Sequence, residues 1–158
     1  KSSYLRLPGI TVGTPQRGDI IVFRPPQNQN EYYIKRVIGL PGDTIKLIDG
    51  YVYLYNTANP DGVKLEEPYL STENAGSTFA TGGIDDFKVP ADHYFVLGDN
   101  RQHSSDSRLC FKESPGSANC GEQGVIPFIT MDVIEGKAGV ALWPNPRVLM
   151  TAQYNNLK

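Results

Sequence analysis

The apolar residues of this chain gather in short runs that are separated by polar, turn-rich segments. Each run has the length of a β-strand and is rich in β-branched and aromatic residues. Asp49-Gly50 stands between two of the runs and is typical of a hairpin turn. No segment keeps a sustained helical period, and only one helical turn is expected, near residues 104–108. The pattern predicts a mostly-β domain of curled sheets, with strands at residues 19–23, 32–38, 44–48, 51–55, 93–97 and 138–143.

The chain has the size of one domain, and its least regular part lies between residues 56 and 88. With 158 residues it can bury a core, so we expect a single domain over residues 1–158. Gly, Asn, Ser and Thr are frequent in residues 56–88, which predicts an inserted loop or a small subdomain. The polar tail from Thr151 to Lys158 is expected to be frayed.

Composition and charge narrow the possible partners. The chain carries 15 basic and 17 acidic side chains without a dense cationic cluster, so we expect no nucleic-acid partner. No apolar stretch approaches the ~20 residues that a membrane helix needs. Because the chain begins at Lys1 and not at Met, we expect a processed protein or a fragment, with any signal or anchor upstream.

The two cysteines, Cys110 and Cys120, bracket a polar stretch that contains turn residues. Such a stretch can fold back and bring the two Cα atoms within disulfide distance, which would indicate an oxidising compartment. Two buried or free thiols are the alternative. A zinc site is not expected, because only His93 and His103 could add ligands and their spacing matches no zinc pattern.

Lys35 is the first candidate for chemistry, because it lies inside an otherwise apolar strand. Alternation places Tyr33, Lys35 and Val37 on one face of that strand. Burial disfavours the charged amine and lowers its pKa, so that a neutral lysine could act as a general base. Alternatively, Lys35 belongs to an edge strand and points into solvent.

The second candidate is the polar segment from Gly98 to Arg108, which follows an apolar strand. Its hydroxyl groups, on Ser104 and Ser105, could hold a buried amine in place by hydrogen bonds. Its charged groups could form ion pairs, Asp106 with Arg108 and Asp99 with Arg101. The alternative is an ordinary polar turn whose charges are solvated.

Three segments, taken in this order, resemble the signature segments of type I signal peptidases, which are Ser/Lys proteases. Shorter matches around Glu66-Glu-Pro-Tyr-Leu70, Phe87-Lys-Val-Pro90 and Trp143-Pro144 extend the resemblance over most of the chain. The three segments are Arg17-Gly-Asp-Ile-Ile-Val-Phe23, Tyr33-Ile-Lys-Arg-Val-Ile-Gly-Leu-Pro-Gly-Asp43 and Gly98-Asp-Asn-Arg-Gln-His-Ser-Ser-Asp-Ser-Arg108.

The resemblance implies a fold, a reaction and a set of site residues. Lys35 falls on the family's general base, and Ser104 on the serine whose hydroxyl orients that lysine. Asp106 and Arg108 fall on a bracing pair, with Asp99 and Arg101 as further support. The implied fold is a set of coiled antiparallel β-sheets.

The implied activity is the removal of signal peptides from secreted preproteins, after a small residue, without metal or cofactor. The implied location is the extracytoplasmic face of a cell membrane, where an anchor absent from this chain would meet the lipid surface.

Two features depart from the family pattern. The family nucleophile is a Ser in a Ser-x-x-Pro motif, and this chain has none; Ser2 and Ser3 lack its flanking residues. We expect the nucleophile upstream of Lys1. The alternative is an inactive homologue that acts as an assembly or chaperone factor, for example in pilus assembly. The second departure is the cysteine-bracketed loop at residues 109–124, where the family passes quickly to the next strand.

Overall fold

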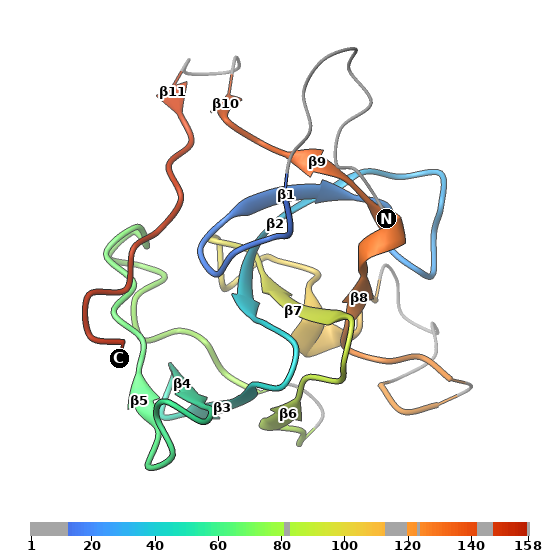
Figure 1. Ribbon diagram of the computed structural model, residues 1–158. Helices are drawn as coiled ribbons and strands as arrows, with labels where there is room; N and C mark the ends of the chain where they lie inside the picture. Colours follow the sequence, from blue (N-terminus) through green and yellow to red (C-terminus); the bar gives the residue numbers. More distant parts are fainter. Residues whose placement is uncertain (1–12, 81–82, 113–119, 123, 142–146, 158) are drawn as a thin grey trace.

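The computed structural model describes residues 13–80, 83–112, 120–122, 124–141 and 147–157 (Figure 1). Within them, every pair of hydrogen-bonded strands is antiparallel, and the only helices are two short 3-10 turns. The prediction of a mostly-β fold with coiled antiparallel sheets is therefore confirmed. The elements are β1 (Ile20–Phe23), β2 (Tyr33–Gly39), β3 (Thr44–Ile48), β4 (Tyr51–Tyr55), β5 (Val63–Lys64), β6 (Asp86–Lys88), β7 (His93–Leu97), η1 (Ser107–Leu109), β8 (Ile129–Thr130), η2 (Met131–Val133), β9 (Ile134–Lys137), β10 (Val140–Ala141) and β11 (Arg147–Val148).

The larger sheet has five strands in the order β8-β7-β2-β1-β9, so that β2 lies at its centre. In this sheet Ile21 of β1 is opposite Lys35, and Leu97 of β7 is opposite Arg36. A four-stranded sheet, called the smaller sheet below, has the order β5-β4-β3-β6 and lies below the larger one in Figure 1, while β10 and β11 form a separate two-stranded sheet. Its β3–β4 hairpin turns at Asp49-Gly50, and both turn residues have positive φ, as a tight hairpin requires.

Two hydrophobic cores form on opposite faces of the central strands. Val37 and Val96 belong to a core whose buried residues come from the five-stranded sheet and Phe111, and Leu40 and residues of η2 also pack against it. Their neighbours Ile38 and Leu97 face the core shared with the smaller sheet. Because successive residues of a strand point to opposite faces, β2 from Arg36 onward and β7 from Tyr94 onward are buried on both sides. The segments that follow β2 and β7 therefore start from buried, well-packed strand ends.

Two segments without long strands contribute to the packing of the two sheets. Residues 56–88, expected to be an inserted loop or a small subdomain, supply the short strands β5 and β6 to the smaller sheet. The expectation of a frayed tail is wrong for residues 151–157. Thr151 donates a hydrogen bond to Asp19, and Tyr154 and Leu157 pack against the core between the sheets. None of the helices in the described part of the chain has the length and apolar character needed to cross a membrane.

Candidate active site

Lys35 lies in the middle of β2, on the face that Tyr33 and Val37 share. Its side chain is half-buried, and its Nζ lies 5.0 Å from the centroid of the Tyr33 ring. Burial lowers the pKa of Lys35 from the ordinary value of 10.5, and the negative charges of Asp106 and Asp99 only partly oppose this effect. Lys35 also lines a small pocket of about 190 Å³. The structure thus provides an amine that gives up its proton more readily than a lysine in solvent.

Ser104 reaches the same place from the segment after β7. Its Oγ is buried and makes no hydrogen bond to any described residue. A Cβ placed on Gly98 would lie 2.1 Å from this Oγ and 3.6 Å from Cδ of Lys35. Because Gly98 has no side chain, Ser104 can pack directly against the backbone at the end of β7. The side chain of Lys35 lies near the same place. An unpaired buried hydroxyl is unusual and indicates a position kept ready for a polar partner.

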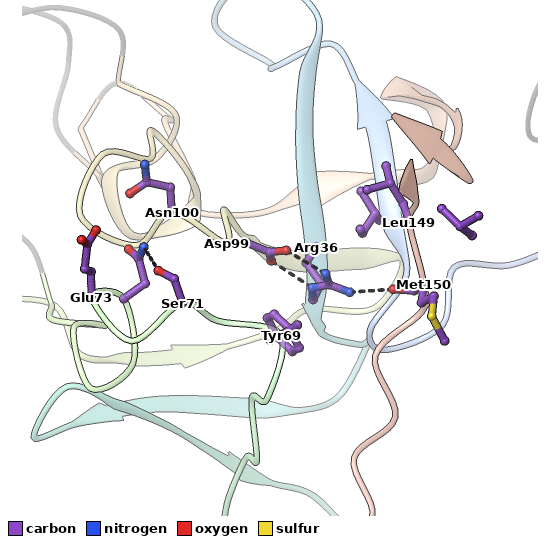
Figure 2. Close-up of a pocket in the computed structure, with 11 residues that line it drawn as sticks. Arg36, Tyr69, Ser71, Glu73, Asp99, Asn100, Leu149 and Met150 are labelled. Carbon is purple, nitrogen blue, oxygen red and sulfur yellow. Dashed lines mark hydrogen bonds and ion pairs between the residues drawn. The ribbon is translucent and has the colours of Figure 1, made fainter. Parts of the chain in front are cut away.

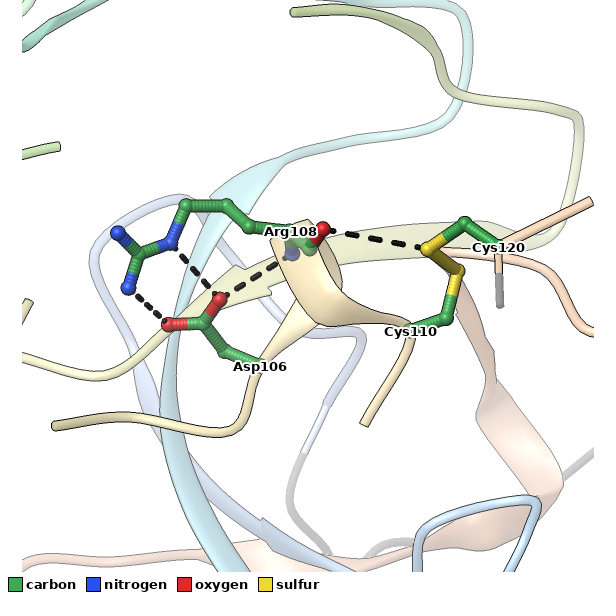
Figure 3. Close-up of a disulfide and its surroundings, with 4 residues drawn as sticks. All are labelled: Asp106, Arg108, Cys110 and Cys120. Atoms are coloured by element: carbon green, nitrogen blue, oxygen red, sulfur yellow. Dashed lines mark hydrogen bonds and ion pairs between the residues drawn. A yellow bond between two sulfur atoms is a disulfide. The ribbon is translucent and has the colours of Figure 1, made fainter. Parts of the chain in front are cut away.

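Asp106 ties the segment that carries Ser104 to the end of β7. It is fully buried, and its carboxylate accepts hydrogen bonds from the backbone N–H groups of Gly98 and Arg108, each at 3.1 Å. The guanidinium of Arg108 binds the same carboxylate with two bonds of 3.0 and 2.9 Å (Figure 3). Arg108 also donates to the carbonyl of Arg101. This pairing, considered from the sequence, is present in the structure.

Cys110 directly follows η1 and forms a disulfide with Cys120. The two Cα atoms are 5.4 Å apart, and Sγ of Cys120 lies 3.9 Å from the carbonyl oxygen of Arg108 (Figure 3). The predicted disulfide is thus confirmed. Of the loop at residues 109–124, residues 113–119 and 123 lie outside the described part of the chain.

Asp99 and Arg101 do not pair with each other, as the sequence suggested they could. Instead, Asp99 forms a two-bond ion pair of 2.9 and 2.7 Å with the buried Arg36, shown in Figure 2. Arg101, which is fully buried, forms an ion pair with Glu67 and also donates to Thr78. Both pairings join segments far apart in the sequence, so short sequence spacing was a poor guide to them.

Sequence reasoning missed three contributors to this region: Arg36, Glu67 and Tyr69. The guanidinium of Arg36 lies 4.0 Å from the centroid of the Tyr69 ring, and Tyr69 donates a hydrogen bond to Glu67. Burial and the nearby Glu67 carboxylate raise the pKa of Tyr69 far above its usual value, so its hydroxyl keeps its proton. The sequence did contain a signal for Arg36. An arginine inside an apolar strand needs a charged or polar partner, so its position predicts an ion pair.

A groove of about 640 Å³ opens beside the Lys35 pocket. Four residues line both spaces, which makes them neighbouring parts of one surface depression: Ile20, Arg36, Asp99 and Leu149. The other residues of the groove are Tyr69, Ser71, Glu73, Asn74, Asn100, Val148 and Met150. Among the residues described, no three His, Cys, Asp or Glu side chains are grouped so that they could hold a metal ion.

The family model for signal peptidases, peptidase S26, matches residues 2–143 of this chain. The match covers most of the sequence and includes Lys35, Ser104 and the braced segment between Gly98 and Arg108. The chain therefore belongs to the signal peptidase family, peptidase S26.

Curated relatives and a solved structure agree with this assignment. A signal peptidase I of Pseudomonas fluorescens is 34% identical over 173 residues, covering 94% of this chain and 59% of that protein. A signal peptidase I of Rickettsia bellii is 40% identical over 124 residues, covering 61% of this chain and 42% of the relative. The crystal structure of a signal peptidase I from Enterococcus faecalis is similar with a TM-score of 0.54 and 30% identity, covering 80% of this chain and 98% of that one. The chain spans about half the length of the curated relatives it matches.

Proposed function

We propose that this chain is the body of a signal peptidase I-type serine endopeptidase, which removes signal peptides from secreted preproteins by Ser/Lys catalysis. One observation carries the proposal. The side chain of the half-buried Lys35, whose pKa is lowered, and the buried, unpaired hydroxyl of Ser104 both lie close to Gly98. Membership of the signal peptidase family supports the same reaction.

In the proposed mechanism, Lys35 is the general base and Ser104 is a positioning residue. Neutral Lys35 takes the proton of the nucleophilic serine hydroxyl as that oxygen attacks the scissile carbonyl carbon. The resulting Lys35 ammonium then gives the proton to the leaving amine, and an acyl-enzyme ester forms. Lys35 next takes a proton from water as the water oxygen attacks the ester carbonyl carbon. The Lys35 ammonium then returns that proton to the departing serine oxygen, and the new carboxylic acid leaves and ionises. We place the nucleophile upstream of Lys1, since the sequence has no Ser-x-x-Pro motif.

The proposed substrate and location follow from the same features. The Lys35 pocket of about 190 Å³ has Ile20, Ile34 and Leu149 in its lining, which suits the small residue before a signal-peptide cleavage site. A disulfide persists in oxidising compartments, so the Cys110–Cys120 bond supports a location on the extracytoplasmic side of a membrane. An anchor outside this chain would hold the enzyme at the lipid surface.

The decisive experiment is cleavage of a preprotein by the full-length protein and by two variants. Lys35→Ala should lower the cleavage rate at least ~10³-fold, because it removes the general base. Ser104→Ala should lower the rate roughly 10- to 100-fold while the thermal unfolding midpoint stays close to that of the wild type. Lys88→Ala, which changes an exposed lysine of β6, is the matched control and should cleave normally. Retained cleavage in Lys35→Ala would refute the mechanism.

A further inference from the structure

The groove next to Lys35 has two chemically different walls. Figure 2 shows Leu149 and Met150 on one side of the Arg36–Asp99 pair, and Ser71, Glu73 and Asn100 on the other. Its volume of about 640 Å³ lies in the range of ligand sites in proteins. An extended polypeptide that passes Lys35 and continues across the ion pair would enter this groove.

The polar wall is held in place by the candidate active site itself. The side-chain oxygen of Asn74 accepts the backbone N–H of Gln102, and the Gln102 amide donates to the Glu73 carbonyl. The backbone N–H of Asn74 in turn bonds to the Ser71 carbonyl, which closes the loop into a tight turn. Arg101 donates to Thr78 at the end of the same loop. Because these hydrogen bonds already fix the polar wall, a ligand that binds there does not have to order it first, which favours selective binding.

The groove carries one unmatched negative charge. Among its lining residues Arg36 and Asp99 neutralise each other, and the exposed Glu73 carboxylate has no ion pair or hydrogen bond within the described part of the chain. A carboxylate that lines a groove attracts a cationic side chain that passes it, although solvent weakens the effect. The groove is therefore suited to a hydrophilic segment with a lysine or arginine, and unsuited to the apolar centre of a signal peptide.

We propose that this groove binds the segment of the preprotein that follows the scissile bond, and that Glu73 favours a basic residue in that segment. The inference rests on the proposed peptidase function and extends it to the mature side of the substrate. Residues before the scissile bond are small or apolar and fit the Lys35 pocket, whereas the larger, half-polar groove accepts the hydrophilic start of the secreted protein.

The test uses the full-length protein and five series of peptide substrates that share one cleavage site. In four series the second, third, fourth or fifth position after the scissile bond carries Lys, Gln or Glu, and in the fifth series one position before the scissile bond does. At low ionic strength, the wild type should cleave the Lys peptide with a kcat/KM about two- to fivefold above the Glu peptide at one or more of these positions. The preference should shrink as salt is added, because the charges are exposed.

Two variants assign the preference to the groove. Glu73→Gln should abolish the ratio between Lys and Glu peptides, and Glu73→Lys should reverse it. Glu66→Gln removes the same charge from an exposed residue that does not line the groove, and it should keep the wild-type ratio.

Each outcome bears on a different statement. Cleavage of all peptides without a charge preference, or a preference that persists in Glu73→Gln, would overturn the role of Glu73. A preference seen only when the charge precedes the scissile bond would overturn the assignment of the groove to the mature side. If no peptide is cleaved at all, the proposed peptidase function fails and this inference fails with it.

Discussion

Replacing Gly98 with alanine should displace the hydroxyl of Ser104 from its position beside Lys35. The new methyl group would lie 2.1 Å from Oγ and 2.6 Å from Cβ of Ser104, whereas ordinary contacts begin near 3.4 Å. Ser104 must therefore retreat by roughly 1 Å. Gly98 has no positive φ that would itself disfavour alanine, so the expected effect comes from this contact.

The magnitude follows from overpacking in a buried place. Forcing a methyl group into a filled position typically lowers the free energy of unfolding by about 1–3 kcal/mol, and we expect Gly98→Ala to fall in this range. A displacement of ~1 Å in a positioning group can reduce catalysis up to about 100-fold. We expect a 10- to 100-fold loss of kcat, with a smaller change in KM because Gly98 is absent from the lining of the groove and the pocket.

Urea unfolding and preprotein cleavage of the full-length protein provide the two measurements. Ser104→Ala would leave Cβ in the way, so relief of the contact needs Ser104→Gly as the second substitution. In that background Gly98→Ala should lose most of its effect on stability, which a double-mutant cycle measures as coupling. Gly139→Ala is the control, since a Cβ there meets nothing within 4 Å. Wild-type stability and activity in Gly98→Ala, or strict additivity in the cycle, would refute the reasoning.

Three further predictions concern charge, the disulfide and the tail. Asp99→Asn removes a negative charge that raises the pKa of Lys35, so the pKa of Lys35 should fall further below 10.5. The rising limb of the pH–rate profile should then move to lower pH, and a move to higher pH would contradict this prediction. Cys120→Ser should lower the free energy of unfolding by about 2–3 kcal/mol in urea, because the short loop is no longer closed; an unchanged midpoint would count against a structural role. Tyr154→Ala should lower the free energy of unfolding by about 2 kcal/mol, since the ring packs on the core and on Tyr69. An unchanged free energy of unfolding would indicate that the tail is frayed.

Local patterns in the sequence were enough to predict six of the strands, whereas β5, β6, β8, β9 and β11 were not among the predicted runs. Where predicted runs and observed strands are compared, residues 44–48, 51–55 and 93–97 coincide, and β1 and β2 each begin one residue later than expected. Period-two alternation and the turn at Asp49-Gly50 depend only on neighbouring residues, which explains this agreement. The run at 138–143 gave β10 at Val140–Ala141, and residues 142–146 lie outside the described part of the chain.

The partners of the charged residues could not be predicted in this way. From spacing, Arg101 was a plausible partner for Asp99, yet the closest carboxylate to Arg101 in space belongs to Glu67, 34 residues away. The order of the C-terminal tail was missed for the same reason, because Thr151 and Tyr154 find their partners on Asp19 and Tyr69.

The sequence by itself determined six of the strands, the signal peptidase family and the choice of Lys35 and Ser104 as candidate site residues. Only the tertiary structure decided that Lys35 and Ser104 both lie close to Gly98, and that the paired Arg36 and Asp99 line both the Lys35 pocket and the groove. The physical reason is the range of the interactions. Strand formation reflects alternation among adjacent residues, whereas the pKa of a buried amine and the choice of an ion-pair partner depend on groups that only folding brings together.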